Sequence, residues 1–204
     1  MQQFRALLEL ADWRRRIAEL YAEVRRNPDP EQAWRHWRAT RDRMIRSHPQ
    51  SPLGADQRRR FEALTFFDYD PERRLVVPLA PPPDESVQEW DIGADGLIRL
   101  RPFARTRGLA NALGGELTVF WIGGYGGGLF LPFADRGNGT HSYGGGRYLL
   151  DGIKGADLGM QDDRLIVDFN FAYNPSCAYS DSWTCPLSPP ENRLPQPVLA
   201  GESL

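Results

Sequence analysis

Residues 116–133 read ELTVFWIGGYGGGLFLPF, in which two largely apolar runs, Glu116–Ile122 and Leu129–Phe133, flank a glycine cluster. Nucleotide-binding loops are also rich in glycine, but they need a helix directly after the loop, whose N-terminus holds the phosphates. Here a strand-like run follows the glycines, and the stretch contains no Gly-Lys-Ser/Thr. Because glycine tolerates the positive φ of tight turns, the stretch predicts an antiparallel hairpin rather than a phosphate-binding loop.

Further short strands are predicted on both sides of this hairpin, separated by turns rich in Gly, Pro and Asp. They cover Thr65–Tyr69, Arg73–Leu79, Ser86–Ile92, Leu97–Phe103, Gly146–Leu150 and Arg164–Phe169. Gly93–Gly96, between the third and the fourth of them, predicts a second hairpin turn. Since no helical pattern separates these strands, they favour antiparallel pairing in a barrel or a sandwich. The proline-rich tail after Tyr173 predicts an ordered coil that wraps this body.

The first 64 residues have a helical period instead. Apolar residues recur at steps of four and three along residues 3–26, which predicts an amphipathic helix. These residues are Ala6, Leu10, Trp13, Ile17, Leu20 and Val24. Asp29 as a cap and Pro30 at the first helical position predict a second helix, which ends near His48-Pro49. A short third helix is predicted over residues 55–64. Arg41 interrupts the apolar face of the second helix, so we expect it under a covering segment or at an edge.

The sequence therefore predicts an α+β protein of one domain, with a helical arm (1–64) packed on an antiparallel β body (65–204). Its 204 residues are enough to bury a core without metals or disulfides. The arm carries net charge +5 and the body −7, which favours complementary packing of the two parts; a basic surface for an anionic partner is the alternative.

The overall net charge of −2 indicates no general attraction to nucleic acid. Glu9 and Asp12 interrupt the apolar residues at the N-terminus, which is not the pattern of a secretory signal. The longest apolar run is far shorter than the roughly 20 residues that cross a bilayer. We therefore expect a cytoplasmic protein without nucleic-acid or membrane partners.

The segment from Asp135 to Tyr148 places acidic, basic and aromatic side chains on a loop rich in glycine, where functional residues often lie. Arg147 enters an apolar strand, so a buried guanidinium there must be paired. An anionic ligand could supply that pairing, because the guanidinium fork matches carboxylate and phosphate. The alternative partners within the chain are Asp135, Asp151 and Asp168.

No metal site is predicted, because His141 has no His or Cys at a ligand spacing. A hydrolase that uses Asp135, His141 and Asp168 is an alternative function, although the chain has no Gly-x-Ser-x-Gly elbow. Cys177 and Cys185 lack the Cys-x-x-Cys spacing of redox motifs. We interpret them as buried reduced thiols, with a local disulfide as the alternative.

A long ordered string of residues resembles an uncharacterised prokaryotic family, domain of unknown function 1684 (DUF1684). The string comprises Tyr143–Leu149, Leu165–Tyr179, Cys185–Leu187, Pro190–Leu194 and Ala200–Glu202, with weaker likeness at Ser51–Leu53 and Pro132–Asp135. The resemblance implies no reaction, ligand or cofactor, since none is established for the family. The chain departs from the family pattern at Gly137, where Thr is expected, and at His141, where Glu is expected.

The polar residues of this string are expected to meet where the tail folds back on the sheet, because buried Asp, Asn and Arg must satisfy one another. The candidate ligand-binding residues are Asp135, His141, Tyr143, Arg147, Asp168, Asn170, Tyr173 and Asn174. The candidate structural residues of the tail are Cys177, Tyr179, Cys185, Glu191 and Asn192. The leading hypothesis is a domain that binds a small polar or anionic ligand. A protein that binds a partner or forms a homodimer through its first helix is the remaining alternative.

Overall fold

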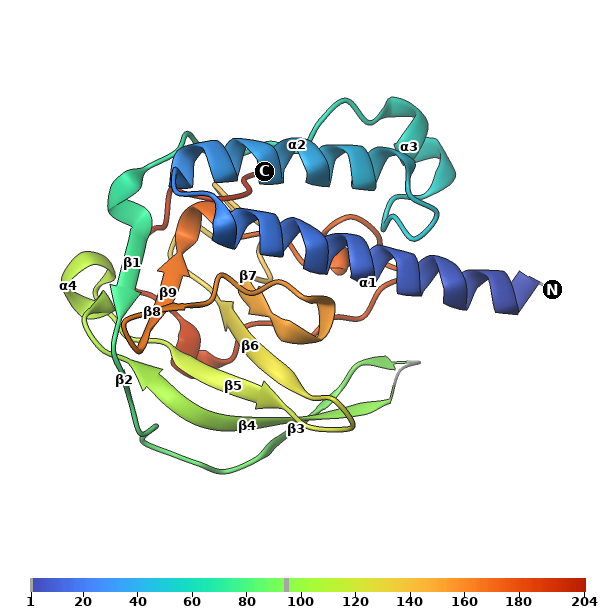
Figure 1. The fold of residues 1–204 in the computed structure, drawn as a ribbon. Helices are drawn as coiled ribbons and strands as arrows, with labels where there is room; N and C mark the ends of the chain where they lie inside the picture. The colour runs from blue at the N-terminus through green and yellow to red at the C-terminus, as the bar shows by residue number, and fades with distance from the viewer. Residues whose placement is uncertain (1, 94–95) are drawn as a thin grey trace.

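The structure, a computed structural model, describes residues 2–93 and 96–204. Two long helices, α1 (Gln2–Arg26) and α2 (Pro30–Ser47), lie side by side along one side of the β body (Figure 1). The cap of α2 is confirmed: the Asp29 carboxylate accepts the backbone N–H groups of Glu31 and Gln32. The third helix, α3 (Ala55–Arg60), is shorter than predicted, because the backbone becomes extended at Phe61.

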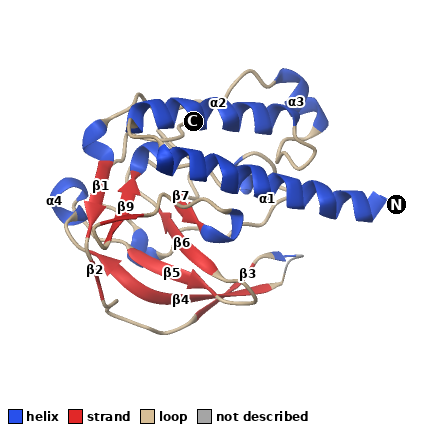
Figure 2. Ribbon diagram, in the orientation of Figure 1, coloured by secondary structure: helices blue, strands red, loops and turns tan. Residues whose placement is uncertain are grey.

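The strands form two antiparallel sheets (Figure 2). The smaller sheet has the order β1-β9-β8 and contains β1 (Arg74–Val77), β8 (Met160–Gln161) and β9 (Arg164–Asp168). The larger sheet has the order β2-β4-β5-β6-β7, with β3 paired to β4. Its strands are β2 (Leu79–Ala80), β3 (Gln88–Asp91), β4 (Leu97–Thr106), β5 (Thr118–Ile122), β6 (Gly128–Phe133) and β7 (Arg147–Asp151).

Both predicted hairpins have their strands paired. The glycine-rich stretch joins β5 to β6, with Phe120 opposite Phe130, so the hairpin reading is confirmed. β3 and β4 pair with Trp90 opposite Ile98. The turn predicted between them at 93–96 includes positions 94 and 95, which lie outside the described residues.

The α+β class is confirmed, but the barrel alternative is wrong. Within the described residues, the larger sheet does not close from β7 back to β2. The free edge of β7 is instead covered by the tail, because Tyr148 exchanges backbone hydrogen bonds with Tyr173. The tail thus supplies hydrogen-bond partners to the backbone of this edge strand, which a closed barrel would have paired with another strand.

Two further local predictions differ from the structure. A short helix, α4 (Leu109–Leu113), lies between β4 and β5, where no helix was predicted. The Glu116 carboxylate caps it from downstream by accepting backbone N–H groups of Gly108, Leu109 and Ala110, so no ordinary cap signal precedes it. The strand predicted at 65–69 contributes only an isolated bridge, from Phe66 to Glu202 in the tail.

The buried apolar residues form two main clusters. One joins the helical arm to the larger sheet, and it includes Trp37 of α2, Phe120 of β5 and Tyr148 of β7. The C-terminal half of the predicted α1 stripe, from Ile17 to Val24, is buried there. The other cluster packs the two sheets together through residues such as Val167 and Phe133. Among the described residues, no helix has both the length and the apolar character that a bilayer crossing requires.

Candidate functional site

The structure distributes the predicted site residues over separate buried clusters, each of which fastens the tail or the arm. Arg147 is the centre of the first cluster. Its side chain has no exposed surface, and its Nη2 donates to Asp135 Oδ2 at 2.9 Å and to the Val198 carbonyl at 2.8 Å. Its Nη1 donates to the carbonyls of Ala200 and Glu202. The guanidinium therefore holds three carbonyls of the tail against β7.

The tail can approach this closely partly because of Gly201. Its φ of +78° lies in the left-handed region, and a Cβ there would lie 2.6 Å from the Ala172 carbonyl oxygen. Burial lowers the pKa of Arg147, and the Asp135 carboxylate opposes that shift. The guanidinium remains charged at any physiological pH, because arginine is not deprotonated in proteins.

Asp168 and Asn170 form a second cluster between α2 and the smaller sheet. Asn170 donates its backbone N–H and its Nδ2 to Asp168 Oδ1, at 3.0 and 2.9 Å. The Asn170 side chain also pairs with the backbone of Asp70, and its carbonyl accepts the indole N–H of Trp34 at 2.9 Å. Burial raises the pKa of Asp168 to about 6, because the hydrogen bonds from Asn170 and the charge of Arg74, whose Nε lies 3.9 Å away, oppose that shift only in part.

Glu202 is the centre of the third cluster and was not predicted as a site residue. Its carboxylate accepts Arg41 Nη2 at 3.0 Å, the backbone N–H and Nδ2 of Asn174 at 3.1 and 3.2 Å, and the Tyr179 hydroxyl. Arg41 thus lies under a covering segment, as its place on the apolar face of α2 indicated. Burial would lower the pKa of Arg41, but the Glu202 carboxylate raises it. Nothing in the local pattern around Glu202 could have indicated this pairing.

The remaining residues of the predicted set lie outside these clusters. His141 is exposed on the loop after Asp135, and its carbonyl accepts the backbone N–H of Leu204. Asn192 donates to the carbonyls of Thr118 and Pro132 and accepts the Thr118 N–H, so it joins the tail to β5 and β6. Glu191 accepts Gln88 Nε2 at 2.7 Å.

The two cysteines are close neighbours and both are free thiols, but the prediction that they are buried is wrong, because both residues are half-buried at the surface of the tail. The Cys177 backbone N–H donates to Cys185 Sγ at 3.3 Å, and the Tyr143 hydroxyl donates to Cys177 Sγ at 3.7 Å. Burial raises the pKa of the Cys185 thiol to about 11. A thiol of this kind is a weak nucleophile near neutral pH, because the thiolate is the reactive species.

A cavity of about 120 Å³ lies between the helical arm, the turn after β7 and the tail; we call it the aromatic cavity. Its aromatic walls are Trp13 and Tyr21 of α1, Tyr148 of β7, and Tyr173, Tyr179 and Trp183 of the tail. Arg41, Lys154 and Asn174 are polar side chains of its lining. Two members of the predicted ligand-binding set, Tyr173 and Asn174, therefore line this cavity together with arm residues that sequence reasoning did not select.

Two residues of the cavity lining, Arg41 and Asn174, each have a buried polar atom without a hydrogen-bond partner. These atoms are Arg41 Nε and Asn174 Oδ1, and both lie behind the cavity wall because they have almost no accessible surface. Such atoms are uncommon, since more than about 90% of buried polar groups in native proteins are paired.

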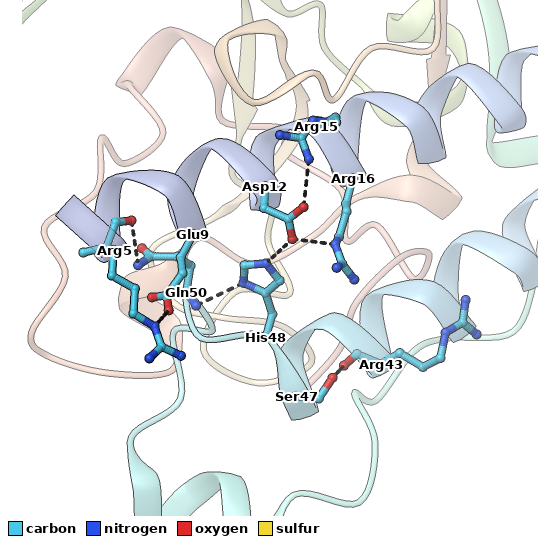
Figure 3. Close-up of polar contacts among 10 residues, drawn as sticks. Arg5, Glu9, Asp12, Arg15, Arg16, Arg43, Ser47, His48 and Gln50 are labelled. Carbon is cyan, nitrogen blue, oxygen red and sulfur yellow. Dashed lines mark hydrogen bonds and ion pairs between the residues drawn. The ribbon is translucent and has the colours of Figure 1, made fainter. Parts of the chain in front are cut away.

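A larger and more open groove of about 840 Å³ runs between α1 and α2. Asp12 is its central acceptor, for Arg15 at 2.9 Å, Arg16 at 2.7 Å and His48 Nε2 at 3.1 Å (Figure 3). The other ring nitrogen of His48 accepts the Gln50 backbone N–H, so neither nitrogen is available to a substrate. The groove pairs its own charges, which is typical of a solvated helix face.

Among the described residues, no group of three or more His, Cys, Asp or Glu side chains is placed to hold a metal ion.

Three exposed apolar side chains, Phe4, Leu7 and Leu8, lie at the N-terminal end of α1, where the helix extends past the β body (Figure 1).

Comparison with known proteins supports the resemblance seen in the sequence. The model of the family described as "Protein of unknown function (DUF1684)" matches residues 59–203. The chain is also similar to the solution NMR structure of an uncharacterised protein of Haloarcula marismortui, with 31% identity and a TM-score of 0.57. That match covers 85% of this chain and 94% of the archaeal one. No functionally curated protein matches the chain.

Proposed function

The chain belongs to the DUF1684 family, whose function is unknown, and from its geometry we propose that it binds a small molecule in the aromatic cavity. The observation that carries the proposal is the cavity itself, whose walls are mostly aromatic and whose charged lining residues, Arg14, Arg41 and Lys154, are all cations. Such a lining fits a small polar or anionic ligand, because guanidinium groups bind carboxylate and phosphate and aromatic walls pack against a ring.

The composition of the walls also supports a binding site. Ligand cavities are mostly apolar and aromatic, with few polar groups that fix the orientation of the ligand. The aromatic cavity has this composition, and its polar groups are held in place by other contacts. Arg41 lies 4.7 Å from the Tyr173 ring centre and is paired with Glu202, and Asn174 is paired with the same carboxylate. These contacts orient the lining before any ligand enters.

A ligand in the aromatic cavity would contact both the helical arm and the tail, so its binding would stabilise the whole fold. A ligand at a hundred times its Kd adds about 2.7 kcal/mol to the free energy of unfolding. For a protein of this size, that corresponds to a rise in Tm of about 5–10 °C.

The test is a thermal-shift screen of small ring compounds, followed by NMR of the indole N–H signals of Trp13 and Trp183. We expect Trp183→Ala to fold as well as the wild type, because Trp183 is partly exposed in the tail, and to reduce the Tm rise given by the best compound, because it removes one aromatic wall of the cavity. Tyr125→Ala is the matched control, since Tyr125 is fully exposed. The proposal fails if no compound moves either indole signal of the wild type, or if every active compound stabilises Trp183→Ala and the wild type equally.

A further inference from the structure

We infer that Cys177 and Cys185 form a reversible disulfide bond within the chain, and that this bond fixes the tail wall of the aromatic cavity. The two thiols are the modification site, and a small-molecule disulfide such as oxidised glutathione is the co-reactant. Seven residues separate the two cysteines, and we call residues 177–185 the cysteine loop. The inference does not depend on the proposed ligand, because it concerns the covalent state of the tail.

The contacts between the two cysteines carry the inference. Cys185 Sγ lies 3.3 Å from the backbone nitrogen of Cys177, from which it accepts a hydrogen bond. The two thiols also hydrogen-bond each other, and this contact adds to burial in raising the pKa of Cys185. A disulfide needs two neighbouring cysteines whose side chains point toward one another. The Cys185 side chain already lies against Cys177, so the bond needs rotation of side chains and not a rearrangement of the fold.

The cysteine loop can adapt to the bond without disturbing a sheet. None of the strands of the described chain includes residues 178–184. The backbone N–H groups of Ala178, Tyr179 and Trp183 each donate to the carbonyl three residues earlier, so these hydrogen bonds are local. Residues 181–184 are exposed, and both cysteines are half-buried. A small disulfide in solution can therefore reach the thiols.

Exchange with oxidised glutathione has two steps. The Cys177 thiolate attacks one sulfur of the glutathione disulfide, whose S–S bond breaks as a mixed disulfide forms; the glutathione that leaves takes up the proton lost by Cys177. The Cys185 thiolate then attacks the Cys177 sulfur, which forms the internal bond and releases the second glutathione with the proton lost by Cys185. Two electrons and two protons thus pass from the protein to the glutathione disulfide.

The surroundings of the thiols assign this order. Cys185, with a pKa of about 11, is a poor nucleophile toward a disulfide in solution, because the thiolate is the attacking species. Its attack on the mixed disulfide takes place within the chain, where proximity compensates for a small thiolate fraction. Cys177 is therefore the thiol that reacts first, and Cys185 is the one that closes the bond.

The bond acts on the aromatic cavity because the cysteine loop forms part of its wall. Tyr179 and Trp183 lie between the two cysteines, and both line the cavity. At the other end of the loop, the Tyr148 hydroxyl donates to the carbonyl of Pro186, the residue after Cys185. A cross-link closes the loop into a ring and removes part of its conformational freedom. Oxidation therefore restricts the two rings that the tail contributes between the cysteines.

The experiment measures how far the full chain is oxidised in glutathione redox buffers, once in native buffer and once in urea. Samples are quenched in acid, and mass spectrometry of their peptides gives the fraction in which Cys177 is linked to Cys185. We expect the equilibrium constant for the internal disulfide to be at least about tenfold larger in native buffer, because the folded chain holds the thiols together. Oxidation should also move the NMR signal of the Trp183 indole N–H. The Trp121 signal is the internal control, since Trp121 lies outside the cavity lining.

Two serine variants test the order of the steps. Cys185→Ser should accumulate the mixed disulfide of Cys177 with glutathione, because the thiol that resolves it is gone. Cys177→Ser should be modified at Cys185 at least about tenfold more slowly than Cys185→Ser at Cys177. Equal rates in the two variants would show that the assigned order is wrong.

The other results decide the inference itself. An equilibrium constant no larger in native buffer than in urea overturns it, and so do disulfides between chains in place of the internal one. If the internal bond forms and the Trp183 signal stays in place, the effect on the cavity wall is wrong, while the disulfide stands. A ligand screen without hits would reject the proposed function and leave these measurements unaffected.

Discussion

Replacement of Arg147 with Met should release the C-terminal tail from the β body. The substitution keeps most of the length of the apolar stem but removes the guanidinium. Asp135, whose side chain is only 1% exposed, then has no counter-ion. The carbonyls of Val198, Ala200 and Glu202 lose their donors in the same step.

The expected cost follows from these contacts. Breaking a buried ion pair by removing one partner costs about 3–5 kcal/mol. Each buried carbonyl left without a donor adds about 1 kcal/mol at the lower end of the usual range, unless the tail moves into water. We therefore expect a loss of at least about 6 kcal/mol in the free energy of unfolding, or local opening of the tail at a smaller global cost. The total stability of a domain is only about 5–15 kcal/mol, so the effect is large.

Two measurements separate global loss from local opening. Urea unfolding gives the change in free energy, and hydrogen exchange of peptides from residues 195–204 reports release of the tail. Arg193→Met is the matched control, because Arg193 lies exposed in the same tail, and it should change stability by less than about 0.5 kcal/mol. Addition of Asp135→Asn to Arg147→Met should recover part of the loss, since the uncompensated buried charge is then removed.

The reasoning is refuted if Arg147→Met unfolds within about 1 kcal/mol of the wild type and the tail amides keep their protection. In that case the other contacts of the tail, such as those of Asn192 and Glu202, would be enough to hold it, and the buried guanidinium would be free for another role.

Two further predictions concern groups whose pKa is shifted by burial. The pKa of Asp168 in the folded protein, about 6, lies above its unfolded value, so the native state binds the proton more tightly and stability falls as the pH rises from about 4 to 6. Asp168→Asn keeps an acceptor for Asn170 but cannot ionise. The free energy of unfolding of Asp168→Asn in urea, relative to the wild type, should therefore rise by roughly 2–3 kcal/mol from pH 4 to pH 8. An equal difference at both pH values would contradict this. Cys185, with a pKa of about 11, should react with iodoacetamide at pH 7.5 roughly a hundredfold more slowly in the folded protein than in urea, as mass spectrometry can follow. Alkylation at the unfolded rate would show that the folded protein does not raise the pKa of this thiol.

The extent to which local elements were predictable depends on where their stabilising contacts lie. The beginning of α2 was predictable, because Asp29 caps the helix through residues two and three positions away. The β5–β6 hairpin was predictable because two apolar runs meet across a short glycine turn. Helix α4 was missed, since its cap is Glu116, which follows the helix instead of preceding it.

The candidate site was predictable only in part. Tyr173 and Asn174 were selected from the polar string of the tail, and both line the aromatic cavity. Tyr21 was not selected, because a tyrosine on the apolar side of a helix has the pattern of an ordinary core residue. Arg147 was recognised as a residue that needs a partner, and a carboxylate of the chain was favoured over a ligand, but only the folded structure shows that the partner is Asp135.

The amino-acid sequence by itself determined the α+β class, the helical arm and the hairpins, because periodicity, capping and turn chemistry act over a few residues. The family was indicated separately, by the resemblance of an ordered string of residues. Only the tertiary structure decided which carboxylate pairs with which arginine and where a cavity remains. Arg41 and Glu202 are 161 positions apart, and the aromatic cavity is built from α1, α2, β7 and the tail. A buried charge requires some partner, but local sequence does not specify which one, since that choice is made by the packing of distant segments.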